Sequence, residues 1–430
     1  MDAELISGPT VKRKRREFPG RAIPALTIPG LSVRRLSIGW PSIHELLWGL
    51  AFPGLVLLGA CSPAVEGPVL LVTSGFTDQI LLVDPVDGTV VATRDMDVRP
   101  SERDEPHSVA VAPNGEHWYA TLSHGEPTLW KYESRGDRLV GRVQLGLKGA
   151  GRIGISPDSR YAILPDYWLG GTGAVSQIVR IDLETLSVGE PREVCSAPHD
   201  AAWSPDGLRV ALTCPLSDEV VLLDGATLDE IWRRRVETDG ATAAGPGSEV
   251  TTGEGTTEGT TGEGASAGGG APVAGNPRFQ PMNLVWAPDG SSMFVTLMRS
   301  GEVLRLLANG EPYGRVRLGG NPTQLAVTPD GQQIVVALRA DFSAALVDAR
   351  SLSLIRRIAV PDIAHPHGVA LSPDGRTAFI SHEGTISSQG GVSAIDLASG
   401  EVLWSREAGV FNLGIAWRPA QNLTAAVSRD

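Results

Sequence analysis

The chain has 430 residues, of which 42% are hydrophobic and 20% charged, a globular composition with room for one large repeat domain or two ordinary domains. The formal net charge of −12 argues against nucleic-acid binding, because contacts with phosphates need a basic surface. The three cysteines, Cys61, Cys195 and Cys214, form no CxxC pair, so a zinc ribbon, a thioredoxin-type site and c-type haem attachment are unsupported.

The first 61 residues differ from the rest and have the pattern of an export leader. A basic run at Lys12–Arg16 precedes an apolar stretch over about 46–58, which is too short to span a bilayer and fits the h-region of a signal peptide. The stretch ends in Leu-Gly-Ala-Cys at Cys61, which resembles the lipobox of bacterial lipoproteins. The resemblance implies cleavage before Cys61, lipidation of that residue, and a membrane-anchored protein facing the periplasm or the cell surface. An uncleaved anchor segment is the alternative.

After this leader, the dominant pattern is an internal repeat of roughly 40–48 residues. Each unit has an apolar segment that runs into Pro-Asp-Gly or a close variant, as in PHGVALSPDG from Pro366. This tripeptide favours a turn, because proline presets φ, aspartate bonds its own backbone and glycine accepts positive φ. The aligned prolines are Pro113, Pro157, Pro205, Pro288, Pro329, Pro373 and Pro419.

Each unit predicts four antiparallel strands, which make one blade of a β-propeller. The first strand precedes the turn and the second follows it, as at Thr377–Ser381. The third ends in an aliphatic residue and an aspartate, as at Ile395–Asp396, and the fourth follows, as at Val402–Trp404. The chain begins in mid-unit and finishes with a lone first strand near Leu413–Trp417, so joining the two ends completes a seventh blade without a free sheet edge.

These repeats resemble the YVTN family of seven-bladed propellers, whose units carry a P-x-x-aliphatic-SPDG strand followed by V-x-aliphatic-ID-x-x-T/S. The resemblance covers about residues 67–420 and implies an all-β propeller of four-stranded blades, with residues 421–430 as a tail. It implies no particular activity, because propellers carry many functions. The long interval between the third and fourth repeat prolines holds a Gly/Thr/Glu-rich tract over 238–276. Its lack of large apolar residues predicts a disordered surface insertion, with a lid or tether as the alternative.

The alignment places histidines where the inner strands begin, at one mouth of the central channel. Counting across each turn predicts side-chain pairs between the first and second strands, and the best of these is His367 opposite His382. Imidazole, thiolate and thioether groups suit copper or zinc. The alternative is that these imidazoles bond a carbonyl of the neighbouring blade. The candidate metal ligands are His107, His124, His199, His367, His382 and Cys214.

Other side chains at this mouth are candidates for ligand contacts. Arg152 is the strongly basic residue beside the inner-strand starts, and it could hold an anionic ligand or pair with Asp166 across its hairpin. Tyr167 and Trp168 could stack on a sugar or a peptide, or pack within a loop. Met282 occupies the histidine position of its own repeat.

Cys195 lies four residues before His199, so it could form a disulfide with Cys214 in an exported protein and remove Cys214 as a ligand. No nucleophile elbow, phosphate loop or HExxH motif appears, and no reaction type is indicated. We therefore expect a cell-envelope lipoprotein that binds a ligand or a protein partner at the channel mouth without catalysis. The alternatives are a copper- or zinc-dependent propeller enzyme, an oxidoreductase or a lactonase-like hydrolase, and a purely structural scaffold.

Overall fold

The computed structural model describes residues 65–99, 101–168, 174–237, 277–360, 364–385 and 387–421. The chain divides into the units Met1–Gly59 and Ala60–Asp430, and every described residue belongs to the second. The predicted leader, Cys61 and the tract 238–276 lie outside the described residues, as do residues 422–430 of the tail.

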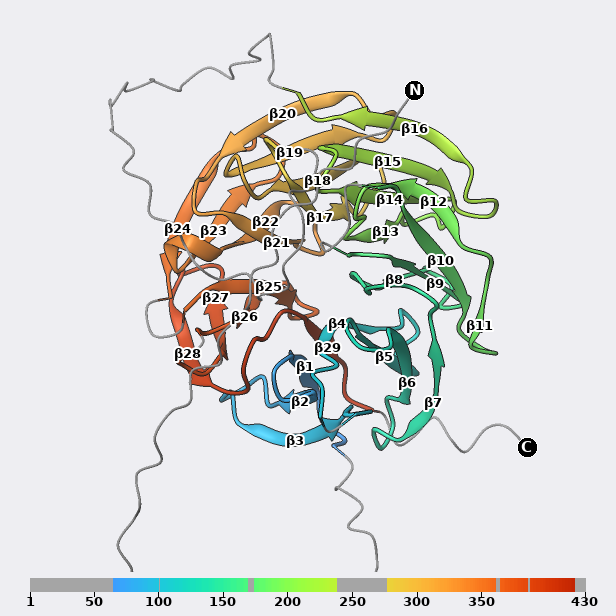
Figure 1. Cartoon of the computed structure of the whole chain (residues 1–430). Helices are drawn as coiled ribbons and strands as arrows, with labels where there is room; N and C mark the ends of the chain where they lie inside the picture. The colour runs from blue at the N-terminus through green and yellow to red at the C-terminus, as the bar shows by residue number, and fades with distance from the viewer. Residues whose placement is uncertain are drawn as a thin grey trace, which may run out of the picture. The chain divides into compact units, whose positions relative to one another are not determined.

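Within the second unit, seven antiparallel sheets form a closed ring, with the inner strands around the centre and the outer strands at the periphery (Figure 1). The prediction of an all-β, seven-bladed propeller is confirmed. The short 3-10 turn η1 (Arg339–Asp341) is the helical element of the described ranges, and no helix there is long and apolar enough to cross a membrane.

We number the blades in chain order and call the blade that joins both ends blade 7. Blade 1 contains β4 (Pro106–Val111), β5 (His117–Leu122), β6 (Thr128–Glu133) and β7 (Leu139–Gln144). Blade 2 contains β8 (Gly154–Ile155), β9 (Tyr161–Pro165), β10 (Ser176–Asp182), β11 (Ser187–Val188) and β12 (Arg192–Cys195). Blade 3 contains β13 (Ala201–Trp203), β14 (Arg209–Cys214), β15 (Glu219–Asp224) and β16 (Glu230–Arg235).

The remaining blades follow the same order from the inner to the outer strand. Blade 4 contains β17 (Pro281–Trp286), β18 (Ser292–Leu297), β19 (Glu302–Leu307) and β20 (Pro312–Arg317). Blade 5 contains β21 (Pro322–Val327), β22 (Gln333–Leu338), β23 (Ser343–Asp348) and β24 (Leu354–Ala359). Blade 6 contains β25 (Pro366–Leu371), β26 (Thr377–His382), β27 (Gly391–Asp396) and β28 (Val402–Glu407). Blade 7 contains β29 (Ile415–Arg418), β1 (Val69–Ser74), β2 (Gln79–Val83) and β3 (Val90–Asp95).

Blade 2 departs from the four-strand pattern, because its outer strand is split into β11 and β12, which both pair with β10. Pro191 lies between the two pieces. Proline has no N–H to donate to a sheet, so an interruption at this point is expected.

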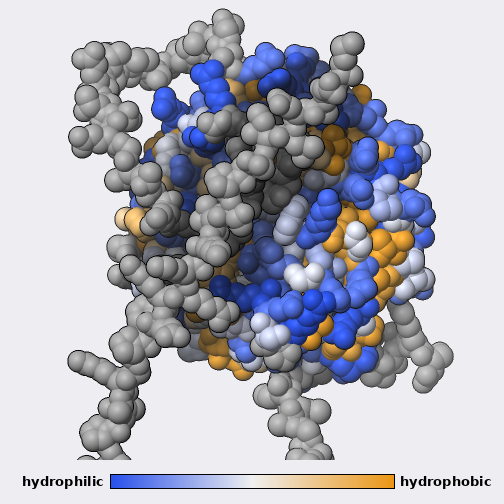
Figure 2. Space-filling model, in the orientation of Figure 1, coloured by the Kyte–Doolittle hydropathy of each residue, from blue (hydrophilic) through white to orange (hydrophobic). Residues whose placement is uncertain are grey.

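The hydrophobic core consists of seven clusters, one at each interface between neighbouring blades. At the interface of blades 7 and 1, for example, Leu71 and Ile80 pack with Trp118 and Ala120. Second and third strands such as β5 and β2 are buried on both faces, whereas outer strands such as β3 and β7 alternate between exposed and half-buried residues. Figure 2 shows hydrophobic patches separated by hydrophilic residues around the periphery.

The ring is closed by β29, the inner strand of blade 7, which pairs with β1 from the other end of the propeller. Arg418 of β29 is fully buried, and its Nη1 lies 2.9 Å from Asp137 Oδ1 of blade 1. Its Nη2 donates to the carbonyl of Val65, 2.7 Å away. One guanidinium therefore holds the first described residue, the last strand and a neighbouring blade together.

Candidate ligand site at the channel mouth

All seven inner strands begin at the same end of the ring, which we call the channel mouth. Six of them are entered through a non-glycine residue in the left-handed conformation, at a cost of the order of 1 kcal/mol each. These residues, with φ from 51° to 63°, are Glu105, Ala197, Gln280, Asn321, His365 and Phe411. In blade 2 the position is Gly149, where a Cβ would approach the Tyr167 carbonyl oxygen to 2.2 Å. The second residue after this position is the repeat position that His107, His199 and His367 occupy.

A β-bulge at the start of the inner strand changes the side-chain pairs that counting predicts. In blade 6, Val369 lies opposite Ile380 as expected, but the register then shifts and places Pro366 opposite His382. The predicted pair of His367 and His382 is therefore wrong. The same shift occurs at the start of β4, β17 and β21. A bulge adds one residue to one strand, so the side chains beyond it no longer face each other.

Two of the predicted metal ligands have other partners. His382 is fully buried within blade 6, and its Nε2 lies 2.9 Å from Ser393 Oγ. His124 is about half exposed, and its Nδ1 lies 3.4 Å from the carboxylate of Glu105. Neither side chain joins the other histidines.

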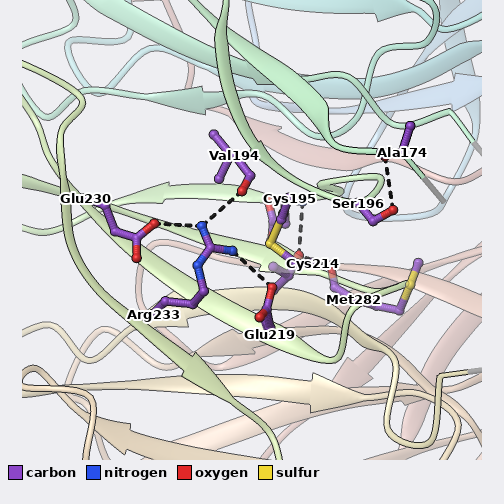
Figure 3. Close-up of a disulfide and its surroundings, with 11 residues drawn as sticks. Ala174, Val194, Cys195, Ser196, Cys214, Glu219, Glu230, Arg233 and Met282 are labelled. Carbon is purple, nitrogen blue, oxygen red and sulfur yellow. Dashed lines mark hydrogen bonds and ion pairs between the residues drawn. A yellow bond between two sulfur atoms is a disulfide. The ribbon is translucent and has the colours of Figure 1, made fainter. Parts of the chain in front are cut away.

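The structure joins Cys214 to Cys195 in a disulfide, which ties the outer strand of blade 2 to the second strand of blade 3 (Figure 3). Arg233 of β16 supports the same junction, because its Nη2 donates to the Val194 carbonyl over 3.0 Å and its Nη1 lies 3.0 Å from Glu219. Cys214 is thus a structural residue in this state and offers no thiolate to a metal.

Three aromatic side chains from blades 1 to 3 meet at the mouth. The rings of His107 and His199 are 5.6 Å apart, and Tyr167 lies edge-on to His199 at 4.5 Å. Tyr167 is also 6.1 Å from His107. Trp168 is more exposed and lies beside His124, with 6.3 Å between the rings. Tyr167 therefore belongs to the mouth cluster, while Trp168 lies outside it.

Two imidazoles are held in one tautomer by carbonyl groups of the next blade. His199 Nδ1 lies 2.7 Å from the Met282 carbonyl oxygen, and His367 Nδ1 lies 2.9 Å from that of Leu413. A carbonyl accepts hydrogen bonds only, so Nδ1 carries the proton in each ring and Nε2 keeps its lone pair. Met282 contributes to the mouth through its backbone.

Burial keeps these imidazoles neutral at pH 7. It lowers the pKa of His199 to about 4, although Asp200 acts in the opposite sense. Burial also lowers the pKa of His367, although the carboxylate of Glu383 acts in the opposite sense. The pKa of His107 is lowered by burial and, in addition, by the nearby His199 and His367. The mouth thus presents imidazole nitrogens as hydrogen-bond acceptors at neutral pH.

Two interblade ion pairs lie beside the histidines. Arg152 Nη1 of blade 2 lies 3.4 Å from Asp200 Oδ2 of blade 3, so the alternative of an ion pair with Asp166 across the hairpin is not the one formed. Arg339 of blade 5 binds Glu383 of blade 6 through two contacts of 2.7 Å. Burial is the largest influence on Glu383 and raises its pKa, but the hydrogen bonds from Arg339 and the charges of Arg339, His367 and His365 together lower the pKa by more.

Asp166 has a different role, because its Oδ1 accepts hydrogen bonds from the backbone of Lys148 and Gly149, each over 2.9 Å. It fixes the loop that enters blade 2.

The predicted metal centre is not assembled in the described part of the chain. No group of three or more His, Cys, Asp and Glu side chains there is arranged to hold a metal ion. His107, His199 and His367 remain near the channel, but the other three predicted ligands are directed away.

No protein-family model matches this chain, and no curated protein matches it. Solved structures do match across most of the chain. A functionally unknown protein from Desulfotomaculum acetoxidans is 15% identical with a TM-score of 0.58, covering 82% of this chain and 99% of that one. A protein from Lactobacillus plantarum is 15% identical with a TM-score of 0.60, over 82% of this chain and 99% of that one.

A third similar structure is the periplasmic gluconolactonase of Pseudomonas aeruginosa, with 19% identity, a TM-score of 0.57, and coverage of 82% of this chain and all of that one. At these identities the comparisons establish the propeller fold and no function.

Sequence reasoning missed Arg339, Glu383 and Asp200. The first two occupy the position immediately after the second strand of their repeats, the same position as Tyr167. Asp200 follows the repeat histidine, as Arg152 follows Gly151 in blade 2. Extending the alignment by one residue on each strand would have placed all of these side chains at the mouth.

Proposed function

We propose that this protein is an exported, membrane-anchored lipoprotein of the YVTN type whose propeller binds a small polar ligand at the channel mouth. The observation that carries the binding proposal is the meeting of His107, His199 and Tyr167 beside Arg152. Imidazole acceptors, guanidinium donors and ring faces are together the kinds of group that bind a small ligand with polar atoms.

The proposal favours binding over catalysis, because the mouth lacks a hydrogen-bonded nucleophile and base in the described residues. A serine–histidine contact does exist between Ser393 and His382, but both side chains are fully buried inside blade 6. No substrate reaches that pair without opening the blade.

A thermal-shift screen of small polar compounds against residues 62–430, followed by calorimetric titration of hits, tests the binding proposal. We expect Tyr167→Ala to weaken a genuine mouth ligand at least tenfold, because it removes one wall of the cluster. His124→Ala is the matched control, since His124 lies outside the cluster. Unchanged affinity in Tyr167→Ala would overturn the assignment to the mouth.

The lipoprotein proposal rests on the Leu-Gly-Ala-Cys sequence at Cys61. Expression of the full chain in a bacterial host with a labelled fatty acid tests it. We expect the label in the wild-type protein and none in Cys61→Ser, with the wild-type protein in the membrane fraction. Equal labelling of both proteins, or of neither, would refute lipidation at this residue.

A second candidate function is hydrolysis of a sugar lactone. Its support is His367, whose Nε2 keeps a lone pair and lies 4.0 Å from Glu383, in a fold shared with the periplasmic gluconolactonase. A neutral imidazole so placed can take a proton from a water that attacks the ester carbonyl. Acid release from gluconolactone above the spontaneous rate, lost in His367→Asn, would favour this function; an equal rate in both proteins would exclude it.

A further inference from the structure

We infer that the ligand of the channel mouth carries a carboxylate group and that Arg152 binds it. This inference rests on the proposed binding function and adds the chemical class of the ligand. It follows from a comparison of the two arginines at the mouth and from the state of the acidic groups around them.

Arg152 and Arg339 both have an acidic partner, but they differ in how many guanidinium N–H groups form hydrogen bonds with it. Arg339 donates through Nε and Nη2 to both oxygens of Glu383, at 2.7 Å each, so its planar fork is occupied. Arg152 makes a single contact of 3.4 Å with Asp200 through Nη1. Its side chain remains 24% exposed, and its guanidinium makes no second hydrogen bond among the described residues.

Asp200 does not depend on Arg152 for its hydrogen bonds. The carboxylate also accepts from the side-chain amide of Asn283 and from the backbone N–H of Leu284, 2.9 Å away. Arg152 can therefore turn toward an incoming anion while Asp200 keeps these two donors. A buried carboxylate with such donors stays satisfied.

The other carboxylates near the mouth already have partners. Asp166 accepts two backbone N–H groups, Glu383 is paired with Arg339, and Glu105 faces His124 at 3.4 Å. An anion at Arg152 would thus meet no carboxylate without a partner among the described mouth residues. The guanidinium fork matches the two oxygens of a carboxylate, which a single point charge does not.

The body of the ligand has a defined wall beside this cation. His107, Tyr167 and His199 form adjoining rings, and the backbone of Arg152 is held next to His199 because its N–H donates to the His199 carbonyl over 2.8 Å. The geometry favours a small organic carboxylate, with its acid group at Arg152 and its remaining atoms against the rings.

Calorimetric titration with matched pairs tests the inference: gluconate against gluconamide, and benzoate against benzamide, on residues 62–430 at pH 7.5 and low ionic strength. The two members of a pair differ chiefly in charge. We expect the carboxylate of at least one pair to bind at least tenfold more tightly than its amide. Arg152→Gln should reduce that preference to about twofold or less.

Arg299→Gln is the control, because Arg299 is an exposed arginine in the loop after β18 at the same end of the ring, and its removal changes the net charge equally. The Arg299→Gln variant should keep its preference for the carboxylate over the amide within twofold of the wild-type preference. Arg152→Lys preserves the charge if Arg152→Gln fails to fold, and should lose most of the preference because lysine lacks the fork.

Equal affinities within each pair, or a preference that survives Arg152→Gln, would overturn the carboxylate inference. A neutral ligand that binds at the mouth without such a preference would overturn it as well, yet leave the proposed binding function standing. If neither these pairs nor any compound of the screen binds, both the inference and the proposed function are wrong.

Discussion

The Nδ1 atom of His199 lies 2.7 Å from the carbonyl oxygen of Met282, which holds the same repeat position in the next blade. His367 repeats this contact with Leu413 at 2.9 Å, and the Thr323 hydroxyl donates to the His367 carbonyl over 2.8 Å. One repeat position therefore links neighbouring inner strands in three places. Two of the histidines that suggested a metal site, His199 and His367, are part of this linkage, and the Nε2 atom of each keeps its lone pair.

The neutral state of His199 predicts acid sensitivity. The folded-state pKa is about 4 and the ordinary value is 6.5, so the unfolded chain binds this proton first as the pH falls. The stability held by neutral His199 is complete above about pH 6.5 and is lost as the pH falls toward 4. Between pH 7.5 and 4.5 we expect a loss of about 2–3 kcal/mol from this residue.

Urea unfolding of the wild-type protein and His199→Asn at both pH values measures this loss. The Asn amide can still donate to the Met282 carbonyl but does not titrate, so the variant should show a pH dependence smaller by that amount. An identical dependence in both proteins would contradict the prediction.

The Cys195–Cys214 disulfide should stabilise the junction of blades 2 and 3. It closes a loop with a sequence separation of 19 residues, and cross-links of that size contribute about 3 kcal/mol. We expect dithiothreitol to lower the unfolding midpoint of residues 62–430. The Cys195→Ala/Cys214→Ala variant should start at the lower value and not respond to dithiothreitol. A wild-type midpoint insensitive to full reduction, checked by thiol titration, would refute the prediction.

Ring closure should depend strongly on Arg418. Replacing it with methionine leaves Asp137 as a buried carboxylate without its closest cation, which costs about 3–5 kcal/mol. Arg138→Ala is the control, because its pair with Glu133 is exposed and contributes about 1 kcal/mol or less. Chemical unfolding of both variants distinguishes them. An equally small loss of unfolding free energy in both variants would show that ring closure does not depend on the ion pair of Arg418 and Asp137.

The close approach of blades 2 and 3 predicts that Gly154 tolerates no side chain. A Cβ at this position would lie 2.1 Å from the Ala201 carbonyl oxygen, and overpacking of this kind typically costs about 1–3 kcal/mol. Gly67→Ala should have little effect, because no atom lies within 4 Å of its Cβ position. Thermal unfolding of both variants tests this difference, and an unshifted melting temperature in Gly154→Ala would be the contrary result.

The sequence was sufficient for the blades because their determinants are local. Pro-Asp-Gly turns and apolar strands recur at each repeat, and the ends of the chain complete each other as β29 and β1. Counting residues outward from each turn predicted the pairing of the first and second strands close to the turn, as the pair of Val369 and Ile380 shows. The positions of the side chains at the mouth did not follow, because the bulge between Pro366 and Val369 breaks the register that counting from the turn assumes.

The ion pairs at the mouth were missed for a related reason. Arg339 and Glu383 stand in adjacent repeats, and their contact arises only when blades 5 and 6 are placed side by side. Asp200 and Arg152 are related in the same way between blades 2 and 3. Comparing one repeat position across neighbouring blades, rather than across one hairpin, is the rule that would have found both.

The pairing of β29 with β1 also sets when the protein can fold during its synthesis. Strands β1, β2 and β3 of blade 7 leave the ribosome before the other six blades, but their inner strand β29 follows those blades in the chain. Until residues 415–418 emerge, the edge of β1 has no partner and the interface with blade 1 lacks Arg418. The ring therefore closes only after all the other blades have been made, and the growing polypeptide must keep that edge from pairing with other chains until then.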